Sequence, residues 1–229
     1  MSAPELLPLH LDVIRPSEGS PPSEHDLYDL MNELFLRDHN TCRYCGMYSP
    51  SKASLEIDHL DGNHGNWNVD NLVTACLWCH GCHHLEFSLN AGAKLVQWDY
   101  PQVAISRITQ QIIISGSLFD SFNQMVEAGT RRREQNFPGG ELAIIINDIP
   151  RLVAQGKAAK AKEYLEMMEA ENIRLAFPTT EYLSEVQAIP GVSPSAWRHF
   201  RRYYIGYVNS NISDANVRAM VFKAWKEMS

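Results

Sequence analysis

The sequence of 229 residues lacks the marks of membrane, secreted and DNA-coating proteins. No apolar run approaches the roughly 18 residues that a membrane span needs. Residues 1–15 contain no basic segment followed by an apolar core, so we expect no secretory signal and an intracellular protein. The net charge of −7 argues against a generally basic surface of the kind that binds phosphate backbones. With 45% hydrophobic residues, the chain is otherwise typical of a globular protein.

Cysteine is scarce, and its placement is the most informative feature of the sequence. All five cysteines lie between Cys42 and Cys82, and five of the nine histidines lie between His59 and His84. An odd number of cysteines, in a chain without an export signal, argues against a framework of disulfide bonds. The clustering therefore predicts that these residues bind a metal ion.

Two Cys-x-x-Cys pairs are typical of a structural zinc site. The first pair is Cys42 and Cys45, and the second, Cys76 and Cys79, follows after 30 intervening residues. Because the two-residue gap lets both sulfurs of a pair face one ion, the pairs predict four thiolates around a single zinc. Cys79 and Cys82 also have this spacing, so the residues alone leave open whether Cys76 or Cys82 completes the site.

Apolar periodicity and turn residues predict an α+β fold. Alternating apolar residues predict short strands over 9–14, 55–60 and 94–99. Apolar residues at helical spacing predict helices over 26–37, 101–115, 118–128, 142–155, 158–174, 179–188, 193–208 and 213–228.

Proline and glycine divide the chain into predicted regions. Pro138, Gly139 and Gly140 lie in a segment that we interpret as an exposed loop or linker. The predicted regions are an N-terminal strand and linker over 1–24, a zinc-binding domain with supporting helices over 25–128, the linker over 129–141, and a helical C-terminal region over 142–229.

The polar residues between the cysteine pairs resemble the motif of the HNH, or ββα-metal, nuclease family. That motif has an Asp-His on a strand, an Asn before a Leu, and a His directly after the last Cys of a zinc knuckle. The matching residues here are Asp58, His59, Asn71 and His80. The spacing from Asn71 to Cys76 is the usual one in the family, which favours Cys76 over Cys82. The resemblance implies a zinc-knuckle ββα-metal domain, followed here by a mostly helical region.

This resemblance also implies a mechanism for hydrolysis of DNA phosphodiester bonds. Asp58 and His80 would bind a divalent ion, Mg²⁺ or Mn²⁺, which stabilises the charge that develops on the phosphate. His59 would act as the general base for water, and Asn71 would orient that base or complete the shell of the ion. A fold can persist after its activity has been lost, so the motif predicts the fold more strongly than the activity.

A longer stretch resembles the IcmJ (DotN) family of type IVB secretion systems and related conjugation machines. It is carried by an Arg-Asp-x-x-Thr-Cys-x-x-Cys-Gly segment over 37–46 and by an Asn-Leu-x-Thr-Ala-Cys segment that begins at Asn71, and it covers residues 6–140. It implies a soluble, zinc-stabilised cytoplasmic adaptor, peripheral at the inner membrane through its partners. Those partners would be the type IV coupling ATPase and other proteins of the substrate-recruiting complex.

The chain also departs from that second family. The relatives generally lack a complete set of Asp58, His59 and His80, whereas all three are present here. The departure keeps two functions open at this point. One is a docking component of a secretion or conjugation apparatus, and the other is a metal-dependent HNH endonuclease.

Two arginine-rich segments are candidate contacts for an anionic partner, DNA included. Residues 190–229 contain six Lys or Arg against two acidic residues, a net charge of +4. The candidate contact residues are Arg131, Arg132, Arg133, Arg198, Arg201 and Arg202. Each segment also has a simpler interpretation. The first is typical of a solvated loop, and the second of an amphipathic helix whose aromatic stripe faces a core.

Overall fold

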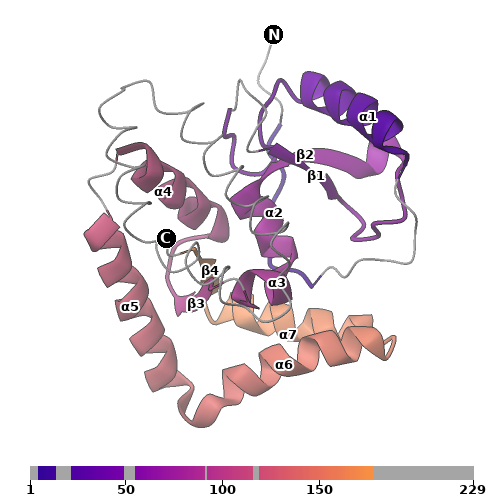
Figure 1. The fold of residues 1–229 in the computed structure, drawn as a ribbon. Helices are drawn as coiled ribbons and strands as arrows, with labels where there is room; N and C mark the ends of the chain where they lie inside the picture. Colours follow the sequence, from indigo (N-terminus) through magenta and orange to yellow (C-terminus); the bar gives the residue numbers. More distant parts are fainter. Residues whose placement is uncertain (1–4, 14–21, 49–54, 91, 116–118, 178–229) are drawn as a thin grey trace.

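The computed structural model describes residues 5–13, 22–48, 55–90, 92–115 and 119–177, and only the backbone of 110–115 and 119–121. It is a mixed α+β structure of small sheets and mostly helices (Figure 1). In chain order the elements are α1 (Glu24–Arg37), β1 (Leu55–His59), η1 (Val69–Asn71), β2 (Leu72–Cys76), α2 (Leu77–His83), α3 (Leu85–Asn90), β3 (Lys94–Gln97), α4 (Gln102–Ser115), α5 (Phe119–Asn136), η2 (Pro138–Gly140), α6 (Glu141–Ala154), α7 (Ala158–Ala170) and β4 (Ile173–Ala176). None of these helices has the length and apolar character needed to cross a bilayer.

A β1–β2–α2 unit positions the residues of interest. The two strands pair antiparallel, with Leu55 opposite Cys76 and His59 opposite Leu72. Every residue of β2 is buried, because α1 packs on the strand and α2 continues directly from its end. Cys76 therefore lies at the strand end and Cys79 in the first turn of α2.

Helix α1 confirms the helix predicted over 26–37. The Ser23 hydroxyl caps its start by accepting a hydrogen bond from the Asp26 N–H. Leu34 and Phe35 are the buried residues of its apolar stripe. The chain leaves the helix at Asp38 and enters the turn that holds Cys42 and Cys45.

A second sheet joins β3 and β4, with Lys94 opposite Ala176 and Gln97 opposite Ile173. Helix α5 packs on β3, whereas α4 and α7 contact β4. The buried Gln102 side chain exchanges two hydrogen bonds of 2.8 Å with the Leu175 backbone, as a neighbouring strand would.

The sequence prediction of a helix over 158–174 is wrong at its end. Helix α7 stops at Ala170, and the chain turns at Asn172 (φ +57°) into β4.

The strand predicted over 9–14 is also wrong within 9–13, where only Val13 forms a β-bridge, to His84. The alternation behind that prediction is nevertheless present. Leu9, Leu11 and Val13 are buried, while the residues between them are exposed. The backbone of this segment pairs with irregular parts of the fold, since the Asp12 N–H bonds to the Cys82 carbonyl. Residue 14 lies outside the described residues.

The loop predicted over 129–141 is wrong for 129–136, which forms the last turns of α5. The predicted turn residues do act as such at 138–140, where Gly139 and Gly140 have φ values of +82° and +79° before α6 begins. The helices predicted over 179–188, 193–208 and 213–228 lie outside the described residues. The division of the chain into domains stays a prediction.

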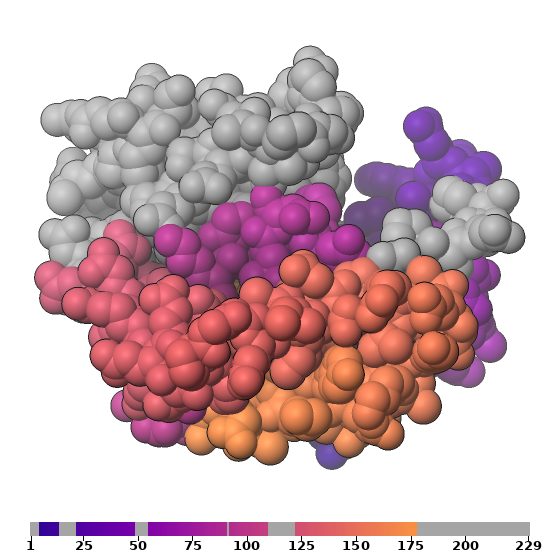
Figure 2. Space-filling view, turned by 90° about the horizontal axis from the view of Figure 1, so that it is seen from below, coloured from indigo at the N-terminus to yellow at the C-terminus, as the bar shows by residue number. Residues whose placement is uncertain are grey.

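One hydrophobic cluster combines segments that are far apart in the sequence. It includes residues of the N-terminal segment, the cysteine turn, β1, β2, α2, α6, α7 and β4. A smaller cluster between β3, α4 and α5 consists of Val96, Trp98, Ile105, Phe122, Val126 and Ala176. Helices α5, α6 and α7 follow one another across a single face of the molecule (Figure 2).

Gly129 explains why α5 can approach β3 so closely. A Cβ atom at this buried position would lie 2.6 Å from Trp98 Nε1 and 3.0 Å from Val96 Cβ. In an open helix, Gly-to-Ala substitution gains about 1 kcal/mol. Here we expect Gly129→Ala to lower the free energy of unfolding by about 1–3 kcal/mol through overpacking. Urea unfolding measures this, with the exposed Gln124→Ala as a neutral control, and unchanged or higher stability of Gly129→Ala would contradict it.

Candidate metal centre and histidine cluster

The turn after α1 presents two cysteines from a tight backbone. The Cys42 N–H bonds to the Met47 carbonyl at 2.8 Å, and the Gly46 N–H bonds to the Cys42 carbonyl at 3.0 Å. Gly46 has φ +78°, a conformation that residues with a Cβ rarely adopt, which accounts for glycine directly after the second cysteine. The turn therefore holds Cys42 and Cys45 with both side chains on one side.

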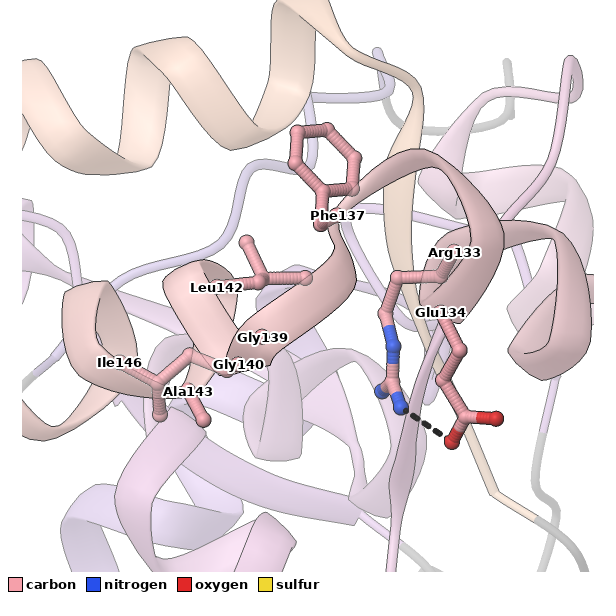
Figure 3. A pocket seen from close by; sticks show the side chains of 8 residues that line it. All are labelled: Arg133, Glu134, Phe137, Gly139, Gly140, Leu142, Ala143 and Ile146. Carbon is pink, nitrogen blue, oxygen red and sulfur yellow. Dashed lines mark hydrogen bonds and ion pairs between the residues drawn. The ribbon is translucent and has the colours of Figure 1, made fainter.

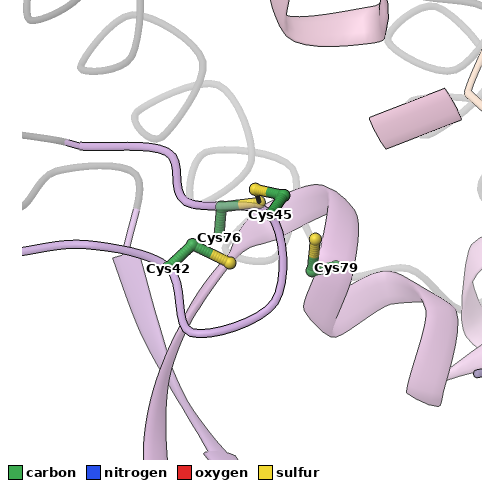
Figure 4. A group of neighbouring side chains, drawn as sticks. All are labelled: Cys42, Cys45, Cys76 and Cys79. Atoms are coloured by element: carbon green, nitrogen blue, oxygen red, sulfur yellow. Dashed lines mark hydrogen bonds between the residues drawn. The ribbon is translucent and has the colours of Figure 1, made fainter. Parts of the chain in front are cut away.

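The structure brings Cys42, Cys45, Cys76 and Cys79 together, with all four Sγ atoms within 4.8 Å of one another (Figure 4). All four residues are buried. The Sγ atoms of Cys45 and Cys76 are 3.7 Å apart, too far for a disulfide bond of about 2.05 Å. This distance matches the edge of about 3.8 Å that a tetrahedron of sulfurs has around zinc at about 2.3 Å. The group is positioned to hold a metal ion and is consistent with zinc.

The protonation of the cysteine thiols is consistent with a metal cation bound between them. Burial raises the pKa of Cys76 and Cys79, and hydrogen bonding to Cys42 and Cys45 raises it further. Four ionised thiolates at this spacing therefore need a cation to neutralise them, and metal binding releases their protons. Cys82 is not a member of the group, and its Sγ instead donates a hydrogen bond to the Trp78 carbonyl at 3.3 Å.

Replacement of single cysteines tests this arrangement. We expect Cys42→Ser to lose both the bound zinc and the cooperative unfolding transition, because the metal links the turn after α1 to the β2–α2 segment. Cys82→Ser is the matched control and should keep the metal. Metal content by mass spectrometry and unfolding by circular dichroism give the two readouts. A well-folded, metal-free Cys42→Ser protein would refute the assignment.

Asp58 lies at the centre of a second group, here called the histidine cluster, which comprises Glu56, Asp58, His59, His64, His80, His83 and His84. Asp58 is fully buried, and its Oδ2 accepts a hydrogen bond from the Tyr44 hydroxyl at 2.7 Å. The same oxygen lies 2.7 Å from His83 Nδ1. Burial raises the pKa of Asp58, but the hydrogen bond and charge of His83 outweigh this and hold that pKa well below its usual range.

His80 has one ring nitrogen on a carboxylate and the other directed into the cluster. Its Nδ1 hydrogen-bonds to Glu56, and its Nε2 lies 3.9 Å from Asp58 Oδ1 and 3.0 Å from His84 Nε2. A carboxylate on the distal nitrogen is typical of metal-binding histidines. Burial lowers the pKa of His80, but Glu56 outweighs it and raises the pKa to about 9. The sequence motifs assign no functional role to His84, although its position four residues after His80, about one helical turn, indicates that the two rings lie on the same side.

His59 is 5% exposed and is covered by neighbouring rings. The ring centroids of His64 and Trp67 each lie 4.9 Å from that of His59. Burial lowers the pKa of His59, and the nearby His64 lowers it further. Within the described part of the chain, the Nε2 atoms of His59 and His64 and the Oδ1 of Asp58 are buried without a hydrogen-bond partner. Such atoms usually have a water or ion as partner.

The side-chain hydrogen bonds of Asn71 join it to Asp61 and Asn66 rather than to His59. Its side chain donates to Asp61 Oδ1 at 2.9 Å and to the Asn66 carbonyl at 3.1 Å, and it accepts from the Asp61 N–H at 3.0 Å. These bonds close the loop that carries His64 and Trp67. Asn71 therefore positions the cover over His59, and its predicted orienting role on the base stays a prediction.

The three adjacent arginines belong to the end of α5 and have partners within the fold. Arg133 donates to the Leu95 carbonyl at 2.7 Å, Arg132 donates to the Gln97 carbonyl, and Arg131 lies 3.8 Å from Glu127. The first two contacts hold α5 on β3. The remaining candidates, Arg198, Arg201 and Arg202, lie outside the described residues.

A cavity of about 280 Å³ lies where α5 meets α6 (Figure 3). Its lining is Arg133, Glu134, Phe137, Gly139, Gly140, Leu142, Ala143 and Ile146. None of these residues belongs to the four-cysteine group or to the histidine cluster. The cysteines and histidines of these two groups therefore lie away from the lining of this cavity.

The Glu56–His80 pair predicts a specific dependence of stability on pH. Because the folded-state pKa of His80 is raised from 6.5 to about 9, the pair stabilises the fold fully below about pH 6.5 and loses this effect as pH rises through 9. We expect Glu56→Gln to lower the free energy of unfolding by roughly 3 kcal/mol at pH 6. The deficit should disappear above about pH 9. Urea unfolding at several pH values, without added divalent ions, measures it.

Glu163→Gln is the control for that series, because it removes an exposed carboxylate paired with Lys160. It should leave the pH profile unchanged, since exposed pairs contribute little to stability. If the loss of free energy of unfolding in Glu56→Gln stays constant from pH 6 to pH 10, the Glu56–His80 pair does not cause the pH dependence of stability.

Comparisons with known proteins give two partial similarities, and no protein-family model matches the chain. The chain is 39% identical over 54 residues to the type 4 apparatus protein DotN of Legionella pneumophila, covering 24% of each protein. It is 36% identical over 76 residues to the H-N-H endonuclease F-TflIV of Escherichia phage T5, covering 32% of this chain and 33% of that protein. The matched part is thus a quarter to a third of each relative's length. The four-cysteine group fits either similarity.

Proposed function

We propose that this chain is a zinc-stabilised, DotN-like component of a type IVB secretion or conjugation apparatus. The observation that carries the proposal is the burial of the residues that a nuclease would need, because Asp58 is 0% and His59 5% exposed. A general base must come within hydrogen-bond reach of the proton that it removes. Here the rings of Trp67 and His64 pack against the imidazole of His59, which leaves only 5% of that residue exposed.

Charge supports the same choice. Residues 42–90 contain two basic and five acidic residues, a net charge of −3, which repels a phosphate backbone. In the proposed role, zinc in the four-cysteine group holds the fold, and the outer surface docks to the coupling ATPase and other proteins of the substrate-recruiting complex. Those partners would keep the chain at the cytoplasmic face of the inner membrane.

A metal-dependent HNH endonuclease is the second candidate, and the unpaired atoms of the histidine cluster favour it. Among the described residues, Asp58 Oδ1 has no hydrogen-bond partner, and it lies 3.9 Å from His80 Nε2. The HNH resemblance assigns a divalent ion to these two residues. Bound Mg²⁺ or Mn²⁺ would supply charge stabilisation of the phosphate. His59 would then serve as the base, and Asn71 would hold the loop beside it.

One pair of assays separates the two candidates. In the first assay, we expect the purified chain to leave supercoiled plasmid intact when Mg²⁺ or Mn²⁺ is added. In the second assay, we expect the chain to co-purify with the coupling ATPase of the same organism. His59→Ala should not change that association, and the exposed His25→Ala serves as the matched control. Metal-dependent nicking by the wild type and His25→Ala, abolished in His59→Ala, would overturn the adaptor and establish the nuclease.

A further inference from the structure

Asp38 is an almost fully buried carboxylate that accepts four hydrogen bonds. It is 1% exposed and directly follows α1. Its Oδ1 accepts from Arg37 Nε at 3.0 Å and from Arg43 Nη1 at 3.2 Å. Its Oδ2 accepts from Arg37 Nη2 at 2.9 Å and from the Thr74 N–H at 2.9 Å. Every lone-pair direction of the carboxylate therefore has a donor.

The donors to Asp38 come from both halves of the four-cysteine group. Arg43 lies between Cys42 and Cys45, and Thr74 lies on β2 two residues before Cys76. The Arg43 N–H also bonds directly to the Thr74 carbonyl at 2.8 Å. The carboxylate thus spans the gap between the first cysteine pair and the strand that delivers the second pair.

Arg37 adds hydrogen bonds between the end of α1 and β2, and we call these contacts, together with those of Asp38, the Asp38 brace. Its guanidinium donates to the Leu72 carbonyl at 2.7 Å and to the Val69 carbonyl at 3.1 Å while it also binds Asp38. The start of β2 is therefore fixed to the end of α1 by the same ion pair. A strand fixed at its start and at Thr74 has little freedom to move Cys76 relative to the turn.

We propose that Asp38 is a positioning residue for the four-cysteine centre, and that it sets the metal affinity by holding the 42–45 turn against β2. The proposal rests on the metal-binding role proposed for those cysteines. Groups outside the ligand shell that orient the ligands typically change metal affinity by about 10–100-fold when they are removed.

Geometry and charge predict opposite effects on zinc affinity when the Asp38 carboxylate is replaced, so a measured affinity can decide between them. Zinc with four thiolates carries a net charge of −2. Removing the negative charge of Asp38 nearby would strengthen metal binding if Coulomb interactions alone decided it. Loss of the brace would weaken binding, because the two cysteine pairs would no longer be held at the separation that one ion requires.

The test compares zinc affinities of folded, full-length variants by competition with a chromophoric chelator. We expect Asp38→Asn to bind zinc about 10–100-fold more weakly than the wild type. Asp29→Asn removes the same charge from an exposed site on α1 and should leave the affinity unchanged. Ile149→Val, in the buried part of α6, costs about 0.5–1.5 kcal/mol of stability and controls for general destabilisation. Replacing zinc by cobalt gives an absorption spectrum that reports the geometry of the four ligands. Of these three variants, we expect only Asp38→Asn to change that spectrum.

Arg43→Gln provides a second variant should Asp38→Asn fail to fold. It removes one donor and leaves the contacts of Asp38 with Arg37 and Thr74, so we expect an affinity loss of about tenfold. Unchanged or tighter zinc binding in these variants, or an equal loss in Ile149→Val, would overturn the positioning role. A wild type that binds no zinc would instead overturn the metal centre itself, so the two failures are distinguishable.

Discussion

Four thiols gathered within 4.8 Å of one another in a buried interior are the constraint on which the rest of this structure depends. Neutral thiols can be buried at little cost, but four thiolates so close together are unfavourable unless a cation neutralises them. The group joins two segments that are about 30 residues apart in the sequence, namely the turn after α1 and the continuous β2–α2 segment. The hydrophobic cluster around the cysteines extends to α6, α7 and β4, so the centre also supports elements distant in the sequence.

The same ββα arrangement places the histidine cluster beside the cysteines, and Tyr44 connects the two. Tyr44 lies within the first cysteine pair, and its hydroxyl binds Asp58 at 2.7 Å. Asp58 and His83 thereby become part of the packing around the metal centre rather than of an open cleft. The contact with Tyr44 gives Asp58 a structural role in this packing that does not depend on any hydrolytic activity.

Local spacing predicted the two cysteine pairs, and the resemblance to the HNH family favoured Cys76 over Cys82; the structure gathers these four cysteines. The roles that the resemblance implies for Asp58, His59 and His80 stay predictions. The errors come from tertiary contacts. Gly129 reads as a loop residue, yet it is required in α5 because Trp98 packs against its backbone. Strand β4 forms only because β3, almost 80 residues earlier, and Gln102 provide its hydrogen-bond partners. The partners of Asp38, Asp58 and Asn71 likewise come from other segments, so no sequence window contains them.

X-ray absorption at the zinc edge of the purified, full-length protein tests the central claim most directly. The account predicts a first shell of four sulfur atoms at about 2.3 Å, with no nitrogen or oxygen ligand. A first shell that contains nitrogen from the histidine cluster, or fewer than four sulfurs, would contradict it. In that case Cys42, Cys45, Cys76 and Cys79 would not form the metal centre, and the histidine cluster would have to be reconsidered as its ligand source.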